Sequence, residues 1–360
     1  MKQFDETQMP AVQGVFQKNA VQNAVYKITG SGTMVAARAR EVAVVGGDGR
    51  QIAVAEALTS LFPEVRIYGP PQAVIPEGLL PSESLNEAIK GAKIIVLPIS
   101  GMNDAGLVRG YRVDQMIDFG NWLEILPEGT LIVAGSLTAK WLRKMDALHL
   151  QAMQYAEDDE LAILNSIPTA EGAVQIAMEE LPITIHGSTV AVIGFGRVGL
   201  TVARLFKALG ARVLVVARRP AVLARAYEMG CEMLHWDSLA AHAGSADIII
   251  NTIPAPVVTA NVLARVKPEV LIIDLASAPG GTDFEVAKKL NIKAKLALGL
   301  PGKVAPQTAG AILARIIPNL ICRFLTNSEA KQSAAKSAAT VANTETDAGA
   351  EKKNESGGGR

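Results

Sequence analysis

The sequence has few cysteines, few aromatic residues and no net charge. Cys231 and Cys322 are its only cysteines, too few for a disulfide framework or a cysteine metal site, and this usage is typical of the reducing cytoplasm. Lysine and arginine together number 35, and aspartate and glutamate also number 35, so no basic excess exists to displace counterions from a nucleic acid. Aromatic residues make up 4% of the chain, which leaves little material for a base-stacking platform. The composition therefore excludes a general nucleic-acid binder.

Long apolar stretches are also absent. No uninterrupted run approaches the ~18 apolar residues that a membrane helix requires, so we expect no membrane span. The first residues lack the charged and apolar regions of a signal peptide, and we expect residues 1–37 to form a poorly ordered extension. Residues 326–360 contain one large aliphatic side chain, Val341. Such a segment cannot bury enough surface to fold, and we expect a disordered tail.

Between these ends, short apolar runs alternate with helical patterns. The chain is 49% hydrophobic, and the alternation predicts two doubly wound (Rossmann-like) α/β domains with parallel sheets and a cleft between them. The runs are Val42–Val45, Val65–Ile67, Ile94–Leu97 and Leu131–Ala134 in the first half, and Val190–Ile193, Val213–Val216, Ile248–Ile250 and Leu271–Ile273 in the second.

The same pattern suggests how the chain is divided. We expect a substrate domain over residues 38–165 and a dinucleotide-binding domain over residues 166–310. A helix over residues 311–325 would pack back on the first domain. Pro168, followed by the acid Glu171, is typical of the first turn of a helix linking the two domains.

A glycine fingerprint follows the run that ends at Ile193. Gly194-Phe195-Gly196-Arg197-Val198-Gly199 fits the pattern Gly-x-Gly-x-x-Gly between an apolar strand and a helical pattern. The first glycine permits the tight turn, the second lets a pyrophosphate approach the backbone, and the third lets helix and strand pack closely. We therefore predict that these six residues bind a dinucleotide. The alternative is a structural turn that holds nothing.

The end of the next strand indicates which dinucleotide. Enzymes that use NAD usually carry an acid there to bind the ribose 2′-hydroxyl. This chain has Arg218 and Arg219 instead, and a guanidinium binds phosphate with two parallel hydrogen bonds. We predict NADP, with Arg218 as the first ligand of the 2′-phosphate and Arg219 as the second. The alternative is a solvated pair at the entry of a helix.

Further distinctive segments lie around the fingerprint. They are Asn165–Gly172, Ile185–Ser188, Asn251–Pro254, Asp274–Phe284 and Gly299–Pro306, with Gly46–Gln51 and Leu97–Ser100 in the first half. Together these segments resemble the family of dipicolinate synthase A subunits, which are NADP-binding and dehydrogenase-like. The resemblance covers roughly residues 42–320, with two departures: Leu298 stands where the family pattern has proline, and Gln307 stands where it tends to have lysine.

The resemblance implies an oxidoreductase. Its reaction would be the NADP-dependent oxidation of dihydrodipicolinate, derived from hydroxy-tetrahydrodipicolinate, to dipicolinate for spore formation. The partner would be the second, B-type subunit of dipicolinate synthase, which is flavoprotein-like, and the chain itself could also form a homo-oligomer. The location would be the cytoplasm of the mother cell of a sporulating bacterium.

Such a reaction mainly requires a flat dicarboxylate to be held beside the cofactor. Ligands of open α/β sheets bind outside the carboxyl ends of the strands, and this rule selects the polar loops of both domains. The expected substrate-binding residues are Arg50, Ser100, Asn165, Ser166, Thr169 and Lys303, and the further cofactor-binding residues are Asn251, Thr252, Ile253, Pro254 and Ser277. Each substrate candidate can equally be a cap, a turn residue or a surface charge.

Glu171 and Lys303 are the candidates for proton transfer, and no metal site is expected. Glu171 has an ordinary alternative, because an acid in the first turn of a helix is favoured by the helix dipole. Two other functions stay open: an NAD(P)-dependent dehydrogenase of a hydroxy or amino acid, or a non-catalytic cofactor-binding partner subunit. The first usually presents a histidine–acid or lysine–histidine pair in its cleft, and none of the four histidines is well placed for one.

Overall fold

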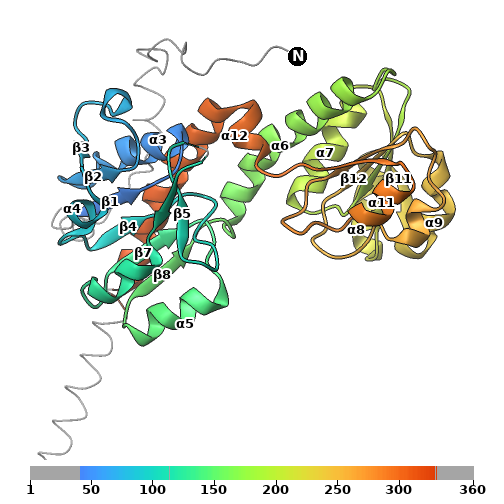
Figure 1. The fold of residues 1–360 in the computed structure, drawn as a ribbon. Coiled ribbons are helices and arrows are strands. Elements are labelled where there is room, and N and C mark those ends of the chain that lie inside the picture. The colour runs from blue at the N-terminus through green and yellow to red at the C-terminus, as the bar shows by residue number, and fades with distance from the viewer. Residues whose placement is uncertain (1–40, 113, 329, 331–360) are drawn as a thin grey trace, which may run out of the picture.

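The computed structural model describes residues 41–112, 114–328 and 330, and it contains two α/β lobes (Figure 1). Each lobe is built on a six-stranded sheet whose neighbouring strands are all parallel. The expected extension of residues 1–37 and nearly all of the expected tail of residues 326–360 lie outside the described residues.

The first lobe has the strand order β3-β2-β1-β4-β7-β8. Because the chain winds outward in opposite directions from β1 and β4, this is the doubly wound order that the sequence predicts. Its strands are β1 (Val42–Val45), β2 (Val65–Tyr68), β3 (Leu80–Pro81), β4 (Ile94–Val96), β7 (Leu131–Ala134) and β8 (Gln151–Gln154); its helices are α3 (Gly49–Leu58), α4 (Leu85–Ile89) and α5 (Ala139–Ala147); and a separate antiparallel hairpin consists of β5 (Leu107–Arg109) and β6 (Met116–Asp118).

The second lobe repeats this order as β11-β10-β9-β12-β13-β14. The switch point, where the winding reverses, lies between β9 and β12. Its strands are β9 (Thr189–Ile193), β10 (Arg212–Ala217), β11 (Glu232–His235), β12 (Ile248–Asn251), β13 (Leu271–Asp274) and β14 (Lys293–Leu296), and its helices are α7 (Arg197–Ala208), α8 (Pro220–Glu228), α9 (Leu239–His242), α10 (Ala260–Leu263) and α11 (Phe284–Lys289).

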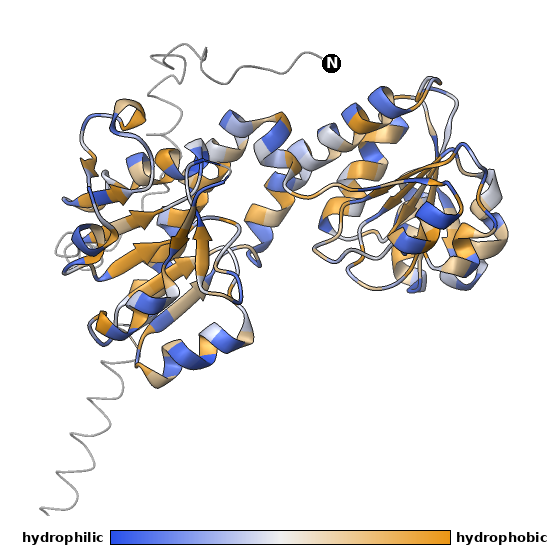
Figure 2. Ribbon diagram, in the orientation of Figure 1, coloured by the Kyte–Doolittle hydropathy of each residue, from blue (hydrophilic) through white to orange (hydrophobic). Residues whose placement is uncertain are grey.

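The predicted fold class is confirmed, and each predicted apolar run is a central strand. These strands are mostly hydrophobic (Figure 2), because both faces of a parallel sheet are covered by helices. The edge strands β3, β8, β11 and β14 were not predicted. Their sequences are LP, QAMQ, EMLH and KAKL, and most of their residues are partly or fully exposed. An edge strand with solvent on one side does not produce a continuous apolar run.

Helix α6 (Asp159–Glu180) connects the lobes (Figure 1). It starts well before its proline, since Asp158 is the N-cap and its carboxylate accepts the backbone N–H of Leu161 at 3.0 Å. The expectation that Pro168 begins this helix is therefore wrong. Pro168 lies inside the helix, where its nitrogen has no hydrogen to donate to the carbonyl four residues earlier.

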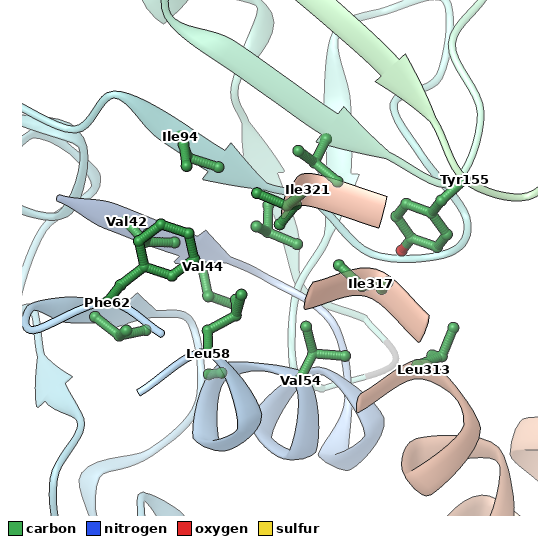
Figure 3. Packing of buried hydrophobic residues seen from close by; sticks show 14 of the residues in the cluster. Val42, Val44, Val54, Leu58, Phe62, Ile94, Tyr155, Leu313, Ile317 and Ile321 are labelled. Carbon is green, nitrogen blue, oxygen red and sulfur yellow. The ribbon is translucent and has the colours of Figure 1, made fainter. Parts of the chain in front are cut away.

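A long C-terminal helix, Pro306–Ser328, completes the first lobe. Among the described residues it is the one helix long and apolar enough to cross a membrane, and most of its apolar segment is buried inside the protein. Leu313, Ile317 and Ile321 pack with Val54 of α3 and Ile94 of β4 in one core (Figure 3). Its hydrophobicity is thus explained by packing in the first lobe.

Replacing Ile317 with alanine should destabilise the protein by about 2–5 kcal/mol, because Ile317 is fully buried and its removal leaves a cavity. Chemical denaturation monitored by circular dichroism measures the change. Ile163→Ala is the matched control, since Ile163 lies on α6 with 51% of its surface exposed and should cost less than about 1 kcal/mol. Equal losses in the two variants would contradict the core position of the C-terminal helix.

Candidate functional site

The turn between β9 and α7 is shaped by contacts that only glycine allows. Gly194 has a φ of +89°, in the left-handed region. A Cβ on Gly199 would lie 2.2 Å from the carbonyl oxygen of Gly194, so strand and helix are as close as a backbone permits. A Cβ on Gly196, in contrast, would meet nothing within 4 Å. This open space is where a pyrophosphate approaches the backbone in such turns.

The N-terminus of α7 has no side-chain cap. Gly196 is its N-cap residue, and no side chain accepts a hydrogen bond from the first turn. The free N–H groups and the helix dipole make this end a ready anion site. The corresponding end of α3 in the first lobe differs, because the carboxylate of Asp48 already accepts the backbone N–H of Arg50 at 3.0 Å. Of these two equivalent turns, the one in the second lobe fits a phosphate.

The remaining residues of the fingerprint frame the turn. Phe195 and Val198 pack at the margin of the second-lobe core. Arg197 extends toward the start of α6, where its Nη1 donates to Asp159 Oδ1 at 2.8 Å and to the carbonyl of Glu157 at 3.4 Å. The Arg197 guanidinium is half exposed and keeps further N–H groups for a ligand.

Arg218 and Arg219 follow β10 at the carboxyl edge of the sheet, and both are exposed. The guanidinium of Arg218 lies over the ring of Trp236, 5.4 Å from its centroid, which holds the charge in place through a cation–π contact. Arg219 is the N-cap residue of α8. No local pattern connects Trp236 with Arg218, since the contact depends on the pairing of β10 with β11.

The loops after β12 and β13 are joined by a buried polar network. Asn251 Nδ2 donates to Asp274 Oδ1 at 2.9 Å, and both side chains are fully buried. Thr282 Oγ1 also donates to Asp274, at 2.7 Å. Thr252 Oγ1 donates to the carbonyl of Ile193 at 2.8 Å, which ties this edge to the glycine turn. Asp274 and Thr282 were not among the predicted site residues.

Four of the predicted cofactor residues therefore differ in their surroundings. Asn251 turns inward, and its Oδ1 accepts the backbone N–H of Ile253 at 3.0 Å, so its amide shapes the loop from within. Ile253 is partly buried against the apolar residues beneath the sheet edge. Pro254 and Ser277 are exposed at the same edge. Direct contact with a ligand is open to the exposed residues and to the backbone of this loop.

In the first lobe, Arg50 is the most strongly organised of the predicted substrate residues. Its Nε and Nη2 donate to Asp48 at 2.9 and 2.7 Å. Burial would raise the pKa of Asp48, but the hydrogen bonds and charge of Arg50 outweigh it and hold that pKa below its usual range. A Cβ on Gly302 would lie 2.6 Å from Arg50 Cζ, so the guanidinium rests against the short helix α12 (Leu300–Val304).

The other substrate candidates are dispersed. The Ser166 hydroxyl contacts the Ile163 carbonyl at 2.6 Å and Thr201 Oγ1 at 2.7 Å, and Thr169 Oγ1 donates to the Asn165 carbonyl at 2.7 Å. These hydroxyls are engaged within or between helices. Asn165 keeps a buried amide oxygen without a partner in the described structure, and Ser100 is exposed after β4.

The two proton-transfer candidates lie on the helices that connect the lobes. Glu171 is exposed on α6. Lys303 is exposed on α12 and lines a cavity of 310 Å³ between α6, β14 and α12, together with Lys295 and Glu179. Gly172 of α6 packs against Leu300, which fixes α12 on α6. No cluster of metal-ligating side chains occurs in the part of the chain that the structure describes.

Known proteins match both lobes of this chain. Residues 41–156 match the N-terminal domain of the dipicolinate synthase A subunit. Residues 167–291 match the NAD binding domain of D-isomer specific 2-hydroxyacid dehydrogenases. The A subunit of dipicolinate synthase from Bacillus subtilis (strain 168) is 41% identical over 288 residues, which are 79% of this chain and 96% of that protein. The chain belongs to the family of dipicolinate synthase A subunits.

Solved structures of this family have the same fold. The dipicolinate synthase A subunit from Bacillus halodurans is 41% identical, with a TM-score of 0.74 over 78% of this chain and 97% of that one. The dipicolinate synthase A chain from Bacillus subtilis is 39% identical, with a TM-score of 0.73 over 80% and 97%. The resemblance predicted from the sequence is confirmed, and the second lobe is an NAD(P)-binding dehydrogenase domain.

The two glycines of the turn should respond differently to alanine. Gly196→Ala leaves the fold nearly unchanged but fills the open space, and we expect NADPH affinity to fall at least about tenfold. Gly199→Ala forces the turn apart, so stability and affinity should fall together. Fluorescence titration with NADPH and thermal unfolding separate the two effects.

Gly49→Ala is the control for both variants, because a Cβ there meets open space in the first lobe. It should change neither measurement by more than a small amount. Wild-type affinity in the Gly196→Ala variant would show that the dinucleotide does not approach this turn.

Proposed function

We propose that this chain is the NADP-dependent subunit of a dipicolinate synthase and oxidises dihydrodipicolinate to dipicolinate. The observation that carries the proposal is the match of the first lobe. Residues 41–156 match a domain described for the dipicolinate synthase A subunit, whereas residues 167–291 match a domain described for 2-hydroxyacid dehydrogenases. Because the second lobe accounts for the cofactor, the substrate should be determined largely by the first.

The reaction removes two hydrogens from the ring. One leaves as a hydride, which the bound cofactor accepts at its nicotinamide, and the other leaves a neighbouring ring carbon as a proton. The gain of aromaticity favours both losses, so the protein mainly has to position a planar dianion and receive one proton. Glu171 and Lys303 are our candidates for receiving that proton.

The substrate carboxylates require cationic or N–H donors. Arg50 suits this role, because Asp48 engages only one edge of its guanidinium and so fixes its orientation. Its contact with Gly302 links it to α12, the helix that leads from the second lobe to the C-terminal helix. Ser100, Asn165, Ser166, Thr169 and Lys303 are the further candidates from the sequence; the Ser166 and Thr169 hydroxyls would have to release their present partners.

We further propose NADP as the cofactor. No acidic residue follows β10, where NAD enzymes usually have one. Arg218 is instead held over Trp236, so a 2′-phosphate would meet a guanidinium whose position is already restricted. Arg219 would be the second ligand. The uncapped end of α7 suits the remaining phosphates of the cofactor.

The family name describes one subunit of an enzyme, and we propose that the active enzyme includes the flavoprotein-like second subunit, in the cytoplasm. A dehydrogenase of hydroxy or amino acids is the second candidate, favoured by the match of residues 167–291. A non-catalytic cofactor-binding protein is the third. The three functions differ in which substrates, if any, the purified chain oxidises.

The chain, with and without the second subunit, should convert freshly formed dihydrodipicolinate and NADP⁺ into equal amounts of NADPH and dipicolinate. Absorbance measures NADPH, and chromatography measures dipicolinate. Turnover of hydroxy or amino acids instead would favour the second candidate. Tight NADP⁺ binding without turnover of any of these, even with the second subunit present, would favour the third.

Arg218→Ala should lower NADP⁺ affinity by about 10- to 100-fold, since a hydrogen bond to a charged group contributes about 1.5–3 kcal/mol. NAD⁺ affinity should stay nearly constant, because NAD lacks the 2′-phosphate. Isothermal titration calorimetry measures both. Arg225→Ala, which removes an exposed arginine from α8 of the same lobe, is the control. An equal loss for both cofactors would contradict the proposed contact.

A further inference from the structure

Asp274 is a fully buried carboxylate at the carboxyl end of β13. It is the register partner of Asn251, the last residue of β12. Its oxygens accept hydrogen bonds from Asn251 Nδ2 at 2.9 Å, Ala276 N at 3.1 Å, Gly281 N at 2.8 Å and Thr282 Oγ1 at 2.7 Å. The loop that runs from Asp274 to Thr282 is thus held by hydrogen bonds to the Asp274 side chain.

Three of the four groups that bind Asp274 can only donate hydrogen bonds to it, which favours a carboxylate at this position. The backbone N–H groups of Ala276 and Gly281 can only donate. The Asn251 amide is oriented by its own loop, because its Oδ1 accepts from Ile253 N and its Nδ2 donates to the Ile253 carbonyl. Of the four partners, the Thr282 hydroxyl alone has lone pairs that could accept a proton from Asp274. The site is therefore built for a carboxylate, which accepts at both oxygens.

In the described part of the chain, no lysine, arginine or histidine forms an ion pair with Asp274. Asp247, at the amino end of β12 in the same sheet, is compensated in the usual way by a cation. It accepts hydrogen bonds from Lys267 Nζ at 2.6 Å and from Thr189 N at 2.8 Å. A buried charge is costly unless its surroundings compensate it. A buried carboxylate without a cationic partner at the ligand-binding edge therefore suggests that its charge acts on a ligand.

The position of Asp274 suggests what its charge acts on. Ligands of doubly wound sheets bind outside the carboxyl ends of the strands at the switch point, which here lies between β9 and β12. Asp274 is on β13, adjacent to β12, and Asn251 joins it to the end of β12. The oxidised nicotinamide ring carries a positive charge, and the reduced ring is neutral. Charges interact strongly across a protein interior of low dielectric.

We propose that Asp274 sets the redox preference of the bound cofactor, favouring the oxidised form over the reduced form. Its negative charge attracts the cationic ring of NADP⁺ and gains nothing from NADPH. This difference promotes release of the reduced cofactor after the oxidation, while it makes the bound oxidised cofactor a weaker hydride acceptor. The inference rests on the cofactor site of the proposed function, and it concerns the ratio of two affinities.

The test measures dissociation constants for NADP⁺ and NADPH by calorimetry and takes their ratio, NADPH over NADP⁺. Asp274→Asn keeps the shape and removes the charge, and the ratio should fall roughly tenfold. Any general damage to the loop weakens both cofactors alike and cancels in the ratio. Asp247→Asn, at the amino end of β12, should leave the ratio unchanged.

Thr282→Val provides the opposite change. It removes one donor to Asp274 and keeps the charge, so the carboxylate is less compensated and the ratio should rise by roughly two- to threefold. This variant also decides the question if Asp274→Asn does not fold. An unchanged or lowered ratio in Thr282→Val, or an unchanged ratio in Asp274→Asn, would overturn the inference.

The wild-type chain separates this result from a failure of the proposed function. If it binds neither NADP⁺ nor NADPH, the proposed cofactor is wrong. If it binds both and the ratio does not depend on Asp274, only the present inference is wrong.

Discussion

The burial of helix α6 in two separate hydrophobic cores is the constraint on which the arrangement of this protein depends. Leu161 packs in the core of the first lobe, while Ala170, Ala173 and Ala177 pack in that of the second. The alanines let α6 approach α7 closely, and Ser166 bonds to Thr201 across that contact. Pro168 lies between the two segments and interrupts the helical hydrogen bonds there. Because α12 packs on the same helix and also contacts Arg50, the glycine turn of the second lobe and Arg50 of the first lobe are both connected to α6.

The two glycine-rich turns of this protein differ in whether a carboxylate caps the helix that follows. The two lobes have the same strand order, and each begins with a glycine-rich turn between its first strand and helix. In the first lobe Asp48 occupies the helix N-terminus, and a carboxylate there satisfies the N–H groups that a phosphate would otherwise need. In addition, a Cβ on Gly46 would lie 2.4 Å from the carbonyl of Arg109, so the hairpin β5–β6 covers this turn. In the second lobe the equivalent N-terminus is left free at Gly196. One architecture thus produces a nucleotide-type turn in one lobe and a closed turn in the other.

Much of the fold could be predicted because its central strands are buried on both faces. Val42–Val45 and Leu271–Asp274 are hydrophobic almost throughout for this reason, and the glycine fingerprint has a local steric cause. The edge strands and the start of α6 could not be predicted in the same way. The strand β14 alternates polar and apolar residues because solvent covers part of it. By local preference Pro168 indicates the start of a helix. The helix nevertheless begins nine residues earlier, because Asp158 caps it and α6 packs against α7.

The sequence alone therefore determined the fold class, the glycine turn, the family and the arginines that follow β10, since each of these is encoded by residues close together in the chain. The tertiary structure decided which side chains meet. It brought Trp236 to Arg218, Gly302 to Arg50, and Asn251, Gly281 and Thr282 to Asp274. Contacts of this kind depend on strand pairing and loop closure between distant segments, and no local pattern records them. The glycine turn could be predicted because its steric requirements involve residues close together in the sequence. The surroundings of the buried Asp274, in contrast, come from several loops at the carboxyl end of the sheet.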